Sequence, residues 1–472
     1  MTLAAALSAP AKPALIPMPE SCTMASAMPF VLTPRIALKN LGAFPAVEFL
    51  QDVVSSRLGA RLKANGVGGS ILFQKGSVPG PEGSYSLSIN PKGITVTASD
   101  DRGAFYAVQT LNQLIASPKD KSLQVSLPSL LIKDSPRFPW RGMHLDVSRH
   151  FFDVKFIKKY IDWLASYKMN VFHWHLLDDG GWRMESRKYP LLTQRGAWRL
   201  GKAGEWSYSN IVFPADKTGK QVYGGYYTIQ EMKEVVAYAA KKHVTVVPEI
   251  EMPGHNQPAI DCYPELGCRL EKRQVNNVFC PGSAKAMQFL KDILDETMEI
   301  FPSKHIHIGA DEVNHSDWEK CPDCARVKSD NSLENSAELQ SWFVRRMDEY
   351  LRSKGRILIG WDEILDGGLA PGAVVMSWRG MGGGEAAVKA GRQAIMTPTS
   401  HCYFDYSYES IPTEKALMFE PVPPGLTPAQ EKLILGGQGN VWTEWIPTES
   451  RVQQMIFPRM LGLAEAFWSP KG

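Results

Sequence analysis

Eight short apolar segments, separated by longer amphipathic stretches, dominate the last two thirds of this chain. Each is typical of a strand that is buried on both faces. The segments span residues 142–147, 171–177, 244–250, 306–310, 357–361, 374–378, 394–397 and 433–437. Strands that alternate with helices favour a parallel sheet, and eight is the number that closes a barrel. The sequence therefore predicts an α/β fold whose main domain is a TIM (β/α)8 barrel.

The helices between these strands are predicted from apolar side chains that recur every three or four residues. In the first, Asp153 can cap the N-terminus, and Phe156, Tyr160 and Leu164 share one face. Similar patterns cover residues 229–241, 284–299 and 335–353.

The first third of the chain has a different pattern, with short apolar runs punctuated by Gly and Pro. Residues 85–98 predict two strands around a turn, and a helix follows with Phe105, Val108 and Leu111 on one face. We expect residues 1–135 to form a small, non-catalytic α+β domain, with residues 136–472 forming the barrel domain. Because two prolines interrupt residues 132–139, this segment is the predicted linker.

Charge and hydropathy exclude some partners. The chain has 52 Lys and Arg against 49 Asp and Glu, scattered along the sequence, so nucleic acid and anionic membranes are poor partners. No apolar run approaches the roughly 18 residues of a membrane span. The opening residues look like the tail of a signal peptide without its basic region, and we expect a secreted, periplasmic or cell-surface protein. Nothing in the sequence indicates an oligomeric state.

The chain has seven cysteines, so at least one is unpaired or joined to another molecule. Cys268 and Cys280 can form a disulfide, with Cys262 as a competitor. Cys321-Pro-Asp-Cys324 has three open interpretations: a local disulfide, half of a structural zinc site or two free thiols. No other cofactor is expected.

Polar and aromatic residues gather at or just beyond the carboxyl ends of the predicted strands. They are Arg149, Asp178, Glu249, His255, Asp311, Glu312, Trp361, Trp378 and Trp442. Barrel enzymes place their chemistry at this rim, because every strand end feeds a loop over one shared pocket.

The adjacent carboxylates Asp311 and Glu312 are the main candidates for catalysis. Like charges held together in a pocket raise the pKa of one carboxyl, which can then donate a proton near neutral pH. Taken alone, the pair also suits a helix N-terminus, where carboxylates interact favourably with the helix dipole. The tryptophans at other strand ends favour catalysis, because with Tyr403 they can enclose a small apolar group.

Seven motifs, in order, resemble those of the family 20 glycoside hydrolases, the β-N-acetylhexosaminidases. They are Asp146-Val-Ser-Arg-His150, His173-Trp-His-Leu-Leu-Asp-Asp179, Pro248-Glu-Ile-Glu-Met-Pro-Gly-His255, His307-Ile-Gly-Ala-Asp-Glu312, Gly360-Trp-Asp-Glu363, Tyr403-Phe-Asp405 and Gly439-Asn-Val-Trp-Thr-Glu444. The resemblance covers nearly the whole chain, since the segment from Gly103 resembles the non-catalytic domain that precedes the barrel in this family.

The resemblance implies exo-hydrolysis of terminal β-linked N-acetylglucosamine or N-acetylgalactosamine from a glycan. In this family the substrate's 2-acetamido group is the nucleophile and forms an oxazolinium intermediate. Asp311 and Tyr403 would hold that group, inside a box formed by Trp361, Trp378 and Trp442. Glu312 would be the general acid and base, and its environment is expected to raise its pKa.

The same resemblance assigns sugar-binding roles to other residues. Arg149 would hold the O3 and O4 hydroxyls, Glu444 would also contact O4, and Asp405 would lie near O6. Asp178 and His255 would form a supporting polar network.

Two departures from the family pattern leave the choice between the two N-acetylhexosamines open. Glu251 stands where the family often has Asp, so its longer side chain must bend. No Trp lies between Tyr406 and Val441, where many relatives have one near O6.

Two other classes of function remain as alternatives. His173-Trp-His175 also suits a metal-dependent TIM-barrel amidohydrolase, although both histidines precede the strand end. A non-catalytic carbohydrate-binding protein would use the tryptophans alone. The Asp311-Glu312 pair disfavours this second class, because binding a neutral sugar does not need adjacent carboxylates.

Overall fold

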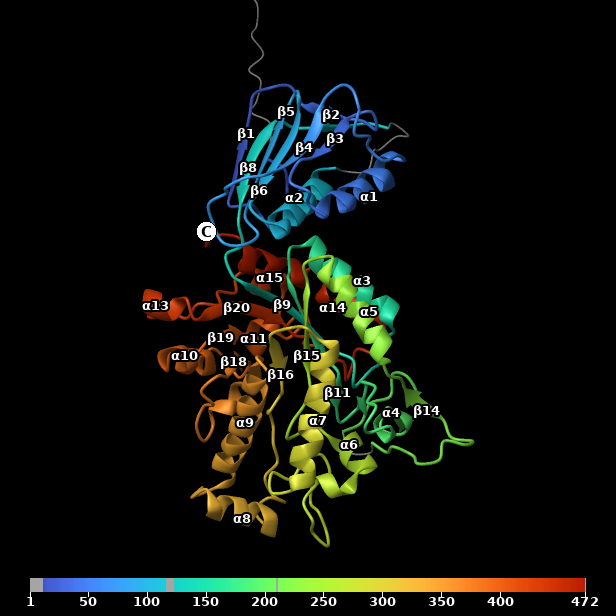
Figure 1. Ribbon diagram of the computed structural model, residues 1–472, viewed down its shortest axis with the longest axis vertical. Coiled ribbons are helices and arrows are strands. Elements are labelled where there is room, and N and C mark those ends of the chain that lie inside the picture. Colours follow the sequence, from blue (N-terminus) through green and yellow to red (C-terminus); the bar gives the residue numbers. More distant parts are fainter. Residues whose placement is uncertain (1–11, 116–122, 209–210, 472) are drawn as a thin grey trace, which may run out of the picture. The chain divides into compact units, whose positions relative to one another are not determined.

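The structure is a computed structural model that describes residues 12–115, 123–208 and 211–471. It divides into two compact units (Figure 1). The first unit contains the chain up to Pro139 together with Ala165–Lys168 and the residues from Ala464 onward; the second contains Trp140–Leu164 and Met169–Leu463. The predicted signal-peptide residues 1–11 lie outside the described residues.

The first unit is an α+β fold built on a six-stranded sheet with the order β1-β8-β5-β6-β4-β3. Its strands are β1 Ser21–Met24, β3 Ala37–Asn40, β4 Ser70–Lys75, β5 Tyr85–Asn90, β6 Gly93–Ala98 and β8 Leu130–Asp134. The predicted pair of strands is confirmed as antiparallel β5 and β6. Helices α1 (Ala46–Leu58) and α2 (Asp101–Leu114) lie on one face of the sheet (Figure 1). Phe105, Val108 and Leu111 are buried as predicted.

The predicted linker was wrong at its beginning. Ile132 to Asp134 belong to β8 and pair with β1 and β5, because alternate residues of β8 point into the sheet core. Only residues 135–139 connect β8 to the first barrel strand.

The second unit confirms the predicted (β/α)8 barrel. Each strand pairs in parallel with the next one along the chain, and the last closes onto the first. The strands are β9 Trp140–Asp146, β10 Val171–His175, β15 Thr245–Glu249, β16 His305–His307, β17 Ile357–Trp361, β18 Val374–Ser377, β19 Ala394–Met396 and β20 Ile434–Gly439. Every residue of β9 and β10 is buried, as expected for strands covered on both faces.

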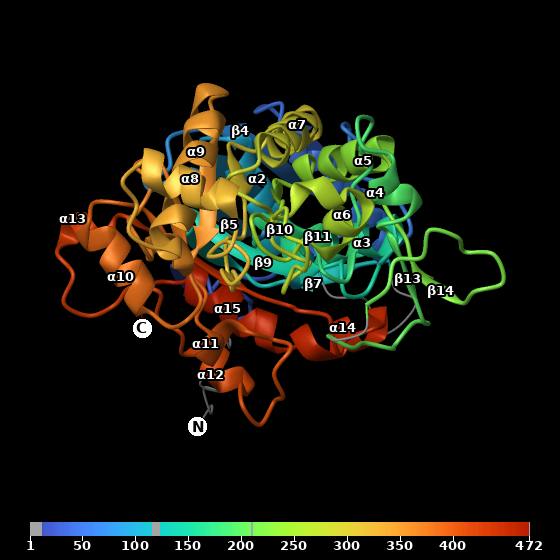
Figure 2. The ribbon, with the colours of Figure 1, turned by 90° about the horizontal axis from the view of Figure 1, so that it is seen from below.

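Helices surround this barrel. They include α3 Val154–Ser166, α5 Ile229–Ala240, α7 Ala284–Ile300, α9 Ser336–Ser353, α10 Gly382–Lys389, α14 Glu449–Ile456 and α15 Arg459–Trp468. Figure 2 shows α5, α7 and α9 outside the strands. Asp153 caps α3 as predicted, because its Oδ1 accepts a hydrogen bond from the Phe156 amide at 2.8 Å. Among the described residues, no helix has the length and apolar character needed to cross a bilayer.

Candidate active site

A cavity of about 450 Å³ opens at the carboxyl ends of the barrel strands. It brings together every residue to which the sequence assigned a catalytic or sugar-binding role except Trp361, whereas Glu249, also expected at the rim, is fully buried and does not line the cavity. Those that line it are Arg149, Asp178, His255, Asp311, Glu312, Trp378, Tyr403, Asp405, Trp442 and Glu444. They follow seven different barrel strands, from β9 to β20. Chain segments almost 300 residues apart therefore converge on one pocket.

Trp361 differs from its predicted position, because it does not line the cavity. As the last residue of β17, it is 1 % exposed and packs beside Trp442, with 5.9 Å between ring centroids. Its indole Nε1 donates a hydrogen bond to Oε1 of Glu249 at 2.9 Å. Trp361 therefore supports the aromatic wall from behind.

The Asp311-Glu312 segment follows β16 through an unusual backbone. Gly309, Ala310 and Glu312 all have positive φ values, of 66°, 69° and 47°. For residues other than glycine this conformation costs on the order of 1 kcal/mol or more, so the surrounding structure must hold it. Gly309 itself has no room for a side chain, because an added Cβ would lie 1.7 Å from Oε2 of Glu251. The turn thus points both carboxylates into the cavity.

The two carboxylates lie in different environments. Asp311 is 8 % exposed, and burial raises its pKa to about 6. The side chain of Glu312 is 61 % exposed and lies at the open side of the cavity lining. The main cause of the raised pKa of Asp311 is burial, followed among the raising charges by Glu249 and Asp178, and not the adjacent carboxylate on which the expectation rested.

His255 connects this pair to a second carboxylate group. Its Nε2 lies 3.8 Å from Oδ2 of Asp311 and 3.7 Å from Oε2 of Glu312. Its Nδ1 lies 3.4 Å from Oδ1 of Asp178 and 3.3 Å from Oδ2 of Asp179. Burial lowers the pKa of His255, but Asp178 and Asp179 outweigh it and raise the pKa well above its usual value. His255 is therefore an imidazolium between two pairs of carboxylates.

Arg149 is almost fully buried on the opposite side of Asp178. Its Nη2 lies 2.9 Å from Oδ2 of Asp178 and 3.8 Å from Oε1 of Glu444, and its Nη1 lies 3.5 Å from Oδ2 of Asp146. Burial acts to lower the pKa of this guanidinium, but the three carboxylates raise it well above its usual value. The guanidinium also lies 5.1 Å from the centroid of the Trp442 ring.

Aromatic rings form one wall of the cavity. Tyr403 and Trp378 are stacked, with 6.1 Å between centroids and 25° between planes. The indole Nε1 of Trp378 donates to Oε2 of Glu363 at 2.9 Å. Burial, followed by the charge of Asp311, raises the pKa of Glu363 to about 8. The neutral form of Glu363 is therefore favoured at neutral pH, although Arg379 lies 3.8 Å away and opposes this.

Several polar atoms in the cavity lining have no hydrogen-bond partner among the described residues. They are Oδ1 of Asp311, Oδ1 of Asp405 and Nε of Arg149, and all three are buried. Buried polar atoms normally have partners, since leaving one unpaired costs about 1–3 kcal/mol. A bound molecule with donors and acceptors can supply these partners.

The longer side chain of Glu251 makes no hydrogen bond to the described residues, and its Oε1 lies 4.0 Å from Nδ1 of His175. Both of its carboxyl oxygens are buried without a partner among the described residues. Burial, followed by the charge of Asp311, raises its pKa well above the usual value. The surroundings therefore favour the neutral form of Glu251, which packs beneath the turn at Gly309.

The HxH pair of the rival metal-dependent function lies inside the barrel, below the cavity lining. His173 and His175 are fully buried in β10. Both contact Glu249, and His307 approaches the same carboxylate with its Nδ1 at 2.9 Å. Burial raises the pKa of Glu249, but the histidines lower it well below the usual value. These groups can surround an ion geometrically, but neither His173 nor His175 reaches the cavity.

Five cavity residues were not predicted from the sequence. They are Asp179, Trp206, Tyr208, Tyr406 and Trp445. Trp206 and Tyr208 lie between β13 (Trp198–Leu200) and β14 (Val222–Gly224), within a long excursion after β10. The hydroxyl of Tyr208 donates to Oε1 of Glu444 at 3.3 Å. Asp179 was contained in a quoted motif, and Tyr406 and Trp445 each come directly after one. The clustered aromatic residues of the excursion were the available signal for Trp206 and Tyr208.

Comparison with known proteins agrees with this geometry. Residues 138–471 match "Glycosyl hydrolase family 20, catalytic domain", and residues 12–135 match "Glycosyl hydrolase family 20, domain 2". A β-hexosaminidase of Porphyromonas gingivalis is 38 % identical over 84 % of this chain, which spans only 52 % of that relative's length.

Two solved structures share the fold over 97 % of the chain. One is a Vibrio harveyi exo-β-N-acetylglucosaminidase in complex with N-acetylglucosamine, at 31 % identity and a TM-score of 0.86, of which 74 % is covered. The other is a β-N-acetylhexosaminidase of Bacteroides fragilis, at 32 % identity and a TM-score of 0.81, of which 92 % is covered. The matches to both domains, together with a cavity to which six of the seven motifs contribute lining residues, show that this chain belongs to glycosyl hydrolase family 20.

Proposed function

We propose that this protein is a β-N-acetylhexosaminidase. It removes terminal, non-reducing β-linked N-acetylglucosamine or N-acetylgalactosamine from glycans and retains the configuration at the anomeric carbon. The observation that carries the proposal is the small cavity with an aromatic wall on one side and unpartnered buried polar atoms on the other. A sugar with an acetamido substituent offers complementary surfaces to both. The activities named for the relatives from Porphyromonas, Vibrio and Bacteroides support this substrate class.

The acetamido group fits the region between Asp311 and the aromatic wall. Its methyl group would pack against Trp378 and Trp442, and its carbonyl oxygen would accept from Tyr403. The free Oδ1 of Asp311 can accept from the acetamido N–H. As the carbonyl oxygen attacks the anomeric carbon, positive charge develops on this group, and an ionised Asp311 stabilises it. Holding a tethered nucleophile in the attacking position can contribute roughly 7 kcal/mol to the barrier reduction.

Glu312 is placed to serve as general acid and base. Its side chain lies at the open side of the cavity, where the leaving group would depart. It would protonate the glycosidic oxygen, and its carboxylate would later take a proton from the water that opens the oxazolinium ring. His255, at 3.7 Å from Glu312, would position the side chain and adjust its proton affinity.

Recognition of the sugar hydroxyls falls to Arg149, Glu444 and Asp405. The unpartnered Nε of Arg149 and Oδ1 of Asp405 are available for hydrogen bonds. Burial raises the pKa of Asp405 to about 7, so a hydroxyl partner would suit either protonation state. Because a continuing chain would leave these atoms unpaired, the cavity favours cleavage at a terminal residue.

The proposal is tested with matched chromogenic substrates. Aryl β-N-acetylglucosaminide and β-N-acetylgalactosaminide should both be hydrolysed, and their ratio of kcat/KM gives the preference at C4. The plain aryl β-glucoside, which lacks the acetamido group, should react negligibly. Equal hydrolysis of the plain glucoside, or no hydrolysis of any of the three, would refute the proposal.

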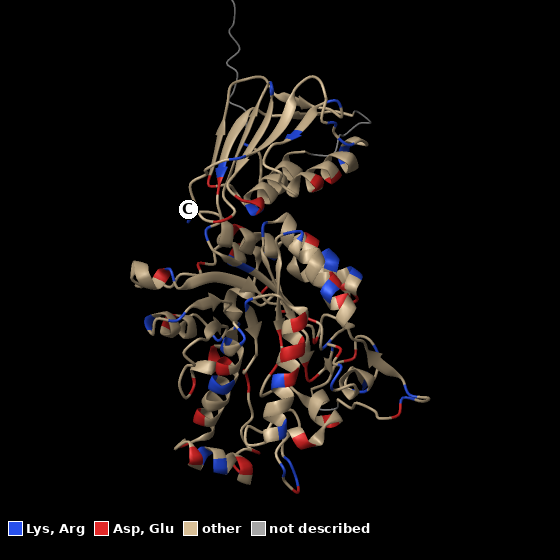
Figure 3. Cartoon of the chain, in the orientation of Figure 1, with Lys and Arg blue, Asp and Glu red and all other residues tan. Residues whose placement is uncertain are grey.

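We also propose that the protein acts outside the cytoplasm, as a secreted, periplasmic or cell-surface enzyme. Two points support this location: the sequence of residues 1–11 looks like the end of a signal peptide, and the proposed substrate is a glycan. Lys and Arg are interspersed with Asp and Glu over the described residues, which suits a neutral glycan better than a polyanion (Figure 3). Fractionation of cells that express the full gene would test the location.

A further inference from the structure

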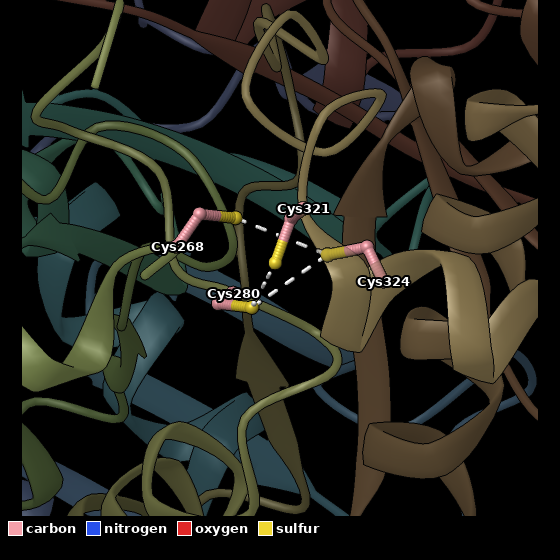
Figure 4. A group of neighbouring side chains, drawn as sticks. All are labelled: Cys268, Cys280, Cys321 and Cys324. Atoms are coloured by element: carbon pink, nitrogen blue, oxygen red, sulfur yellow. Dashed lines mark hydrogen bonds between the residues drawn. The ribbon is translucent and has the colours of Figure 1, made fainter. Parts of the chain in front are cut away.

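Four cysteines from two distant parts of the chain meet in one buried cluster (Figure 4). Cys268 and Cys280 belong to the loop after η1 (Pro264–Leu266), whereas Cys321 and Cys324 lie at the beginning of α8 (Pro322–Asp330). All four side chains are at most 4 % exposed. We infer that Cys268, Cys280, Cys321 and Cys324 bind one structural zinc ion.

The distances between the sulfur atoms match a tetrahedral site. Cys280 Sγ lies 3.7 Å from Cys321 Sγ and 3.6 Å from Cys324 Sγ, and Cys268 Sγ lies 3.9 Å from Cys324 Sγ. All four sulfur atoms lie within 4.8 Å of one another. A Zn–S bond of about 2.3 Å in a regular tetrahedron places the sulfur atoms about 3.8 Å apart. The four thiolates therefore surround a space of the correct size for one ion.

Other arrangements of these cysteines fit less well. A disulfide requires about 2.05 Å between sulfur atoms, and all four cysteines are free thiols. Two disulfides would bring the four sulfur atoms together as two separate close pairs. Instead, the Sγ atom of Cys280 is nearly equidistant from those of Cys321 and Cys324. Four thiols without an ion would leave mutually close polar groups in an apolar pocket. Four cysteine sulfur atoms in a tetrahedral arrangement are typical ligands of zinc, an ion that undergoes no oxidation or reduction in proteins.

The surroundings are those of a structural site. Apolar side chains enclose the sulfur atoms, among them Val278, Trp318 and Leu339. Cys321 is the N-cap of α8 and Cys324 lies in its first turn, where the helix dipole stabilises thiolates. Gly282 permits the close approach of the two segments, because an added Cβ would lie 2.3 Å from the backbone of Asp323.

The site would fix a loop that supports the catalytic residues. The Phe279 amide donates to the Pro253 carbonyl at 2.8 Å, and the Asn256 amide donates to the Asn277 carbonyl at 2.9 Å. These bonds hold the segment that carries His255. The side chain of Asn277 also donates to Oδ2 of Asp179 at 2.9 Å.

The second cysteine pair belongs to the segment that follows Asp311 and Glu312. In this segment, Asp317 accepts from the amides of Gln274 and Val275. Zinc would thus join the loops after β15 and β16. None of the four cysteines lines the cavity, so the ion has no place in the proposed reaction.

Metal analysis of the full chain tests the inference. The protein is purified without chelators and without a metal-affinity column. We expect about one zinc per chain by mass spectrometry, and X-ray absorption should show four sulfur neighbours at about 2.3 Å. Titration of the thiols with an organomercurial should release the same single equivalent of zinc. Nitrogen or oxygen neighbours, iron in place of zinc, or a metal content near zero would overturn the inference.

Cysteine-to-serine variants test whether the zinc ion is bound by this cluster. Cys324→Ser should lose the zinc and lower the unfolding temperature. Cys262→Ser is the matched control, because Cys262 is also buried but lies outside the cluster, with its Sγ 3.3 Å from the Leu191 carbonyl. The control should keep the full equivalent of zinc. If Cys324→Ser does not fold, the X-ray absorption of the unmodified protein decides the question. An intact mass lower by four hydrogens would show two disulfides and refute the site.

Discussion

Arg149 and Asp178 form a buried ion pair, with 2.9 Å between Nη2 and Oδ2. The same oxygen accepts a hydrogen bond from Nε2 of His175, whose Nδ1 contacts Glu249 in the barrel interior. Burial lowers the pKa of His175, but Glu249 and Asp178 raise it to about 10. A chain of alternating charges therefore connects the cavity-lining Arg149 to the barrel core. Arg149 serves both the pocket and the fold.

The first prediction is that Arg149→Ala loses stability as well as activity. Its removal takes the buried guanidinium away from Asp178, Asp146 and Glu444, and breaking a buried pair in this way costs about 3–5 kcal/mol. The double variant Arg149→Ala/Asp178→Asn should lose less than the sum of the two single losses, because both partners of the 2.9 Å pair are removed together. Denaturant unfolding of the two single variants and the double variant measures the coupling energy.

Arg346→Ala is the control, because the Arg346 side chain is 43 % exposed and its ion pair with the exposed Glu349 lies at the surface. Its unfolding free energy should change by less than about 1 kcal/mol. Strictly additive losses for Arg149→Ala and Asp178→Asn would show that the two residues do not interact.

The second prediction is that the effect of Glu312→Gln depends on the leaving group. An amide cannot donate a proton, so turnover of N-acetylhexosaminides with poor leaving groups should fall by about 10²–10⁴-fold. Substrates with an activated aryl group should lose much less, because that group departs with little protonation. The exposed Glu319→Gln should behave like the unmodified enzyme on both substrates. Equal losses on the two substrates would remove Glu312 from the acid role.

The barrel was predictable because its strands are short, apolar and buried on both faces. The return from β19 to β20 was not, since it uses three short helices in place of one amphipathic helix. They are α11 Thr399–Cys402, α12 Thr413–Leu417 and α13 Pro428–Glu431. None is long enough to show helical periodicity. The prolines at 136 and 139 marked the domain connection, but they did not show that β8 continues to Asp134.

Most of the pocket was predictable because side chains that follow parallel strands meet at one rim. Trp361 is the exception, since it lies on β17 itself and its indole is directed to Glu249. The cysteine cluster could not be predicted from the sequence, for a different reason. Cys280 and Cys321 are separated by α7 and β16, so only the fold brings their sulfur atoms within 3.7 Å.

The third prediction concerns the pH dependence of stability. Burial raises the pKa of Asp311 to about 6, with His255 opposing this and Glu249 and Asp178 adding to it. The folded protein therefore binds the proton more tightly than the unfolded chain, whose usual value is 3.8. Above about pH 6 the buried charge destabilises the fold by at most about 3 kcal/mol, and below about pH 4 this cost disappears.

Asp311→Asn should therefore be more stable than the unmodified protein at pH 8 and equally stable near pH 4. Unfolding by urea across this range measures the difference. Asp366→Asn, at a largely exposed side chain, should show no such divergence. A variant that is less stable at pH 8 would show that the ionised Asp311 stabilises the fold.

The last prediction separates neighbouring-group attack from attack by an enzyme carboxylate. A thiazoline that mimics the cyclic intermediate should inhibit competitively and tightly, because it resembles the species that the pocket stabilises. Asp311→Asn should weaken this inhibitor about tenfold to a hundredfold, because a charge-assisted hydrogen bond worth roughly 1.5–3 kcal/mol is lost. Asp179→Asn serves as a comparison, since Asp179 lines the cavity but bonds His255, Gln257 and Asn277 on the far side from the acetamido group. It should weaken the inhibitor less than Asp311→Asn does. A covalent glycosyl ester trapped on any Asp or Glu, or efficient cleavage of substrates with a 2-hydroxyl group, would exclude the acetamido nucleophile while leaving the glycosidase assignment intact.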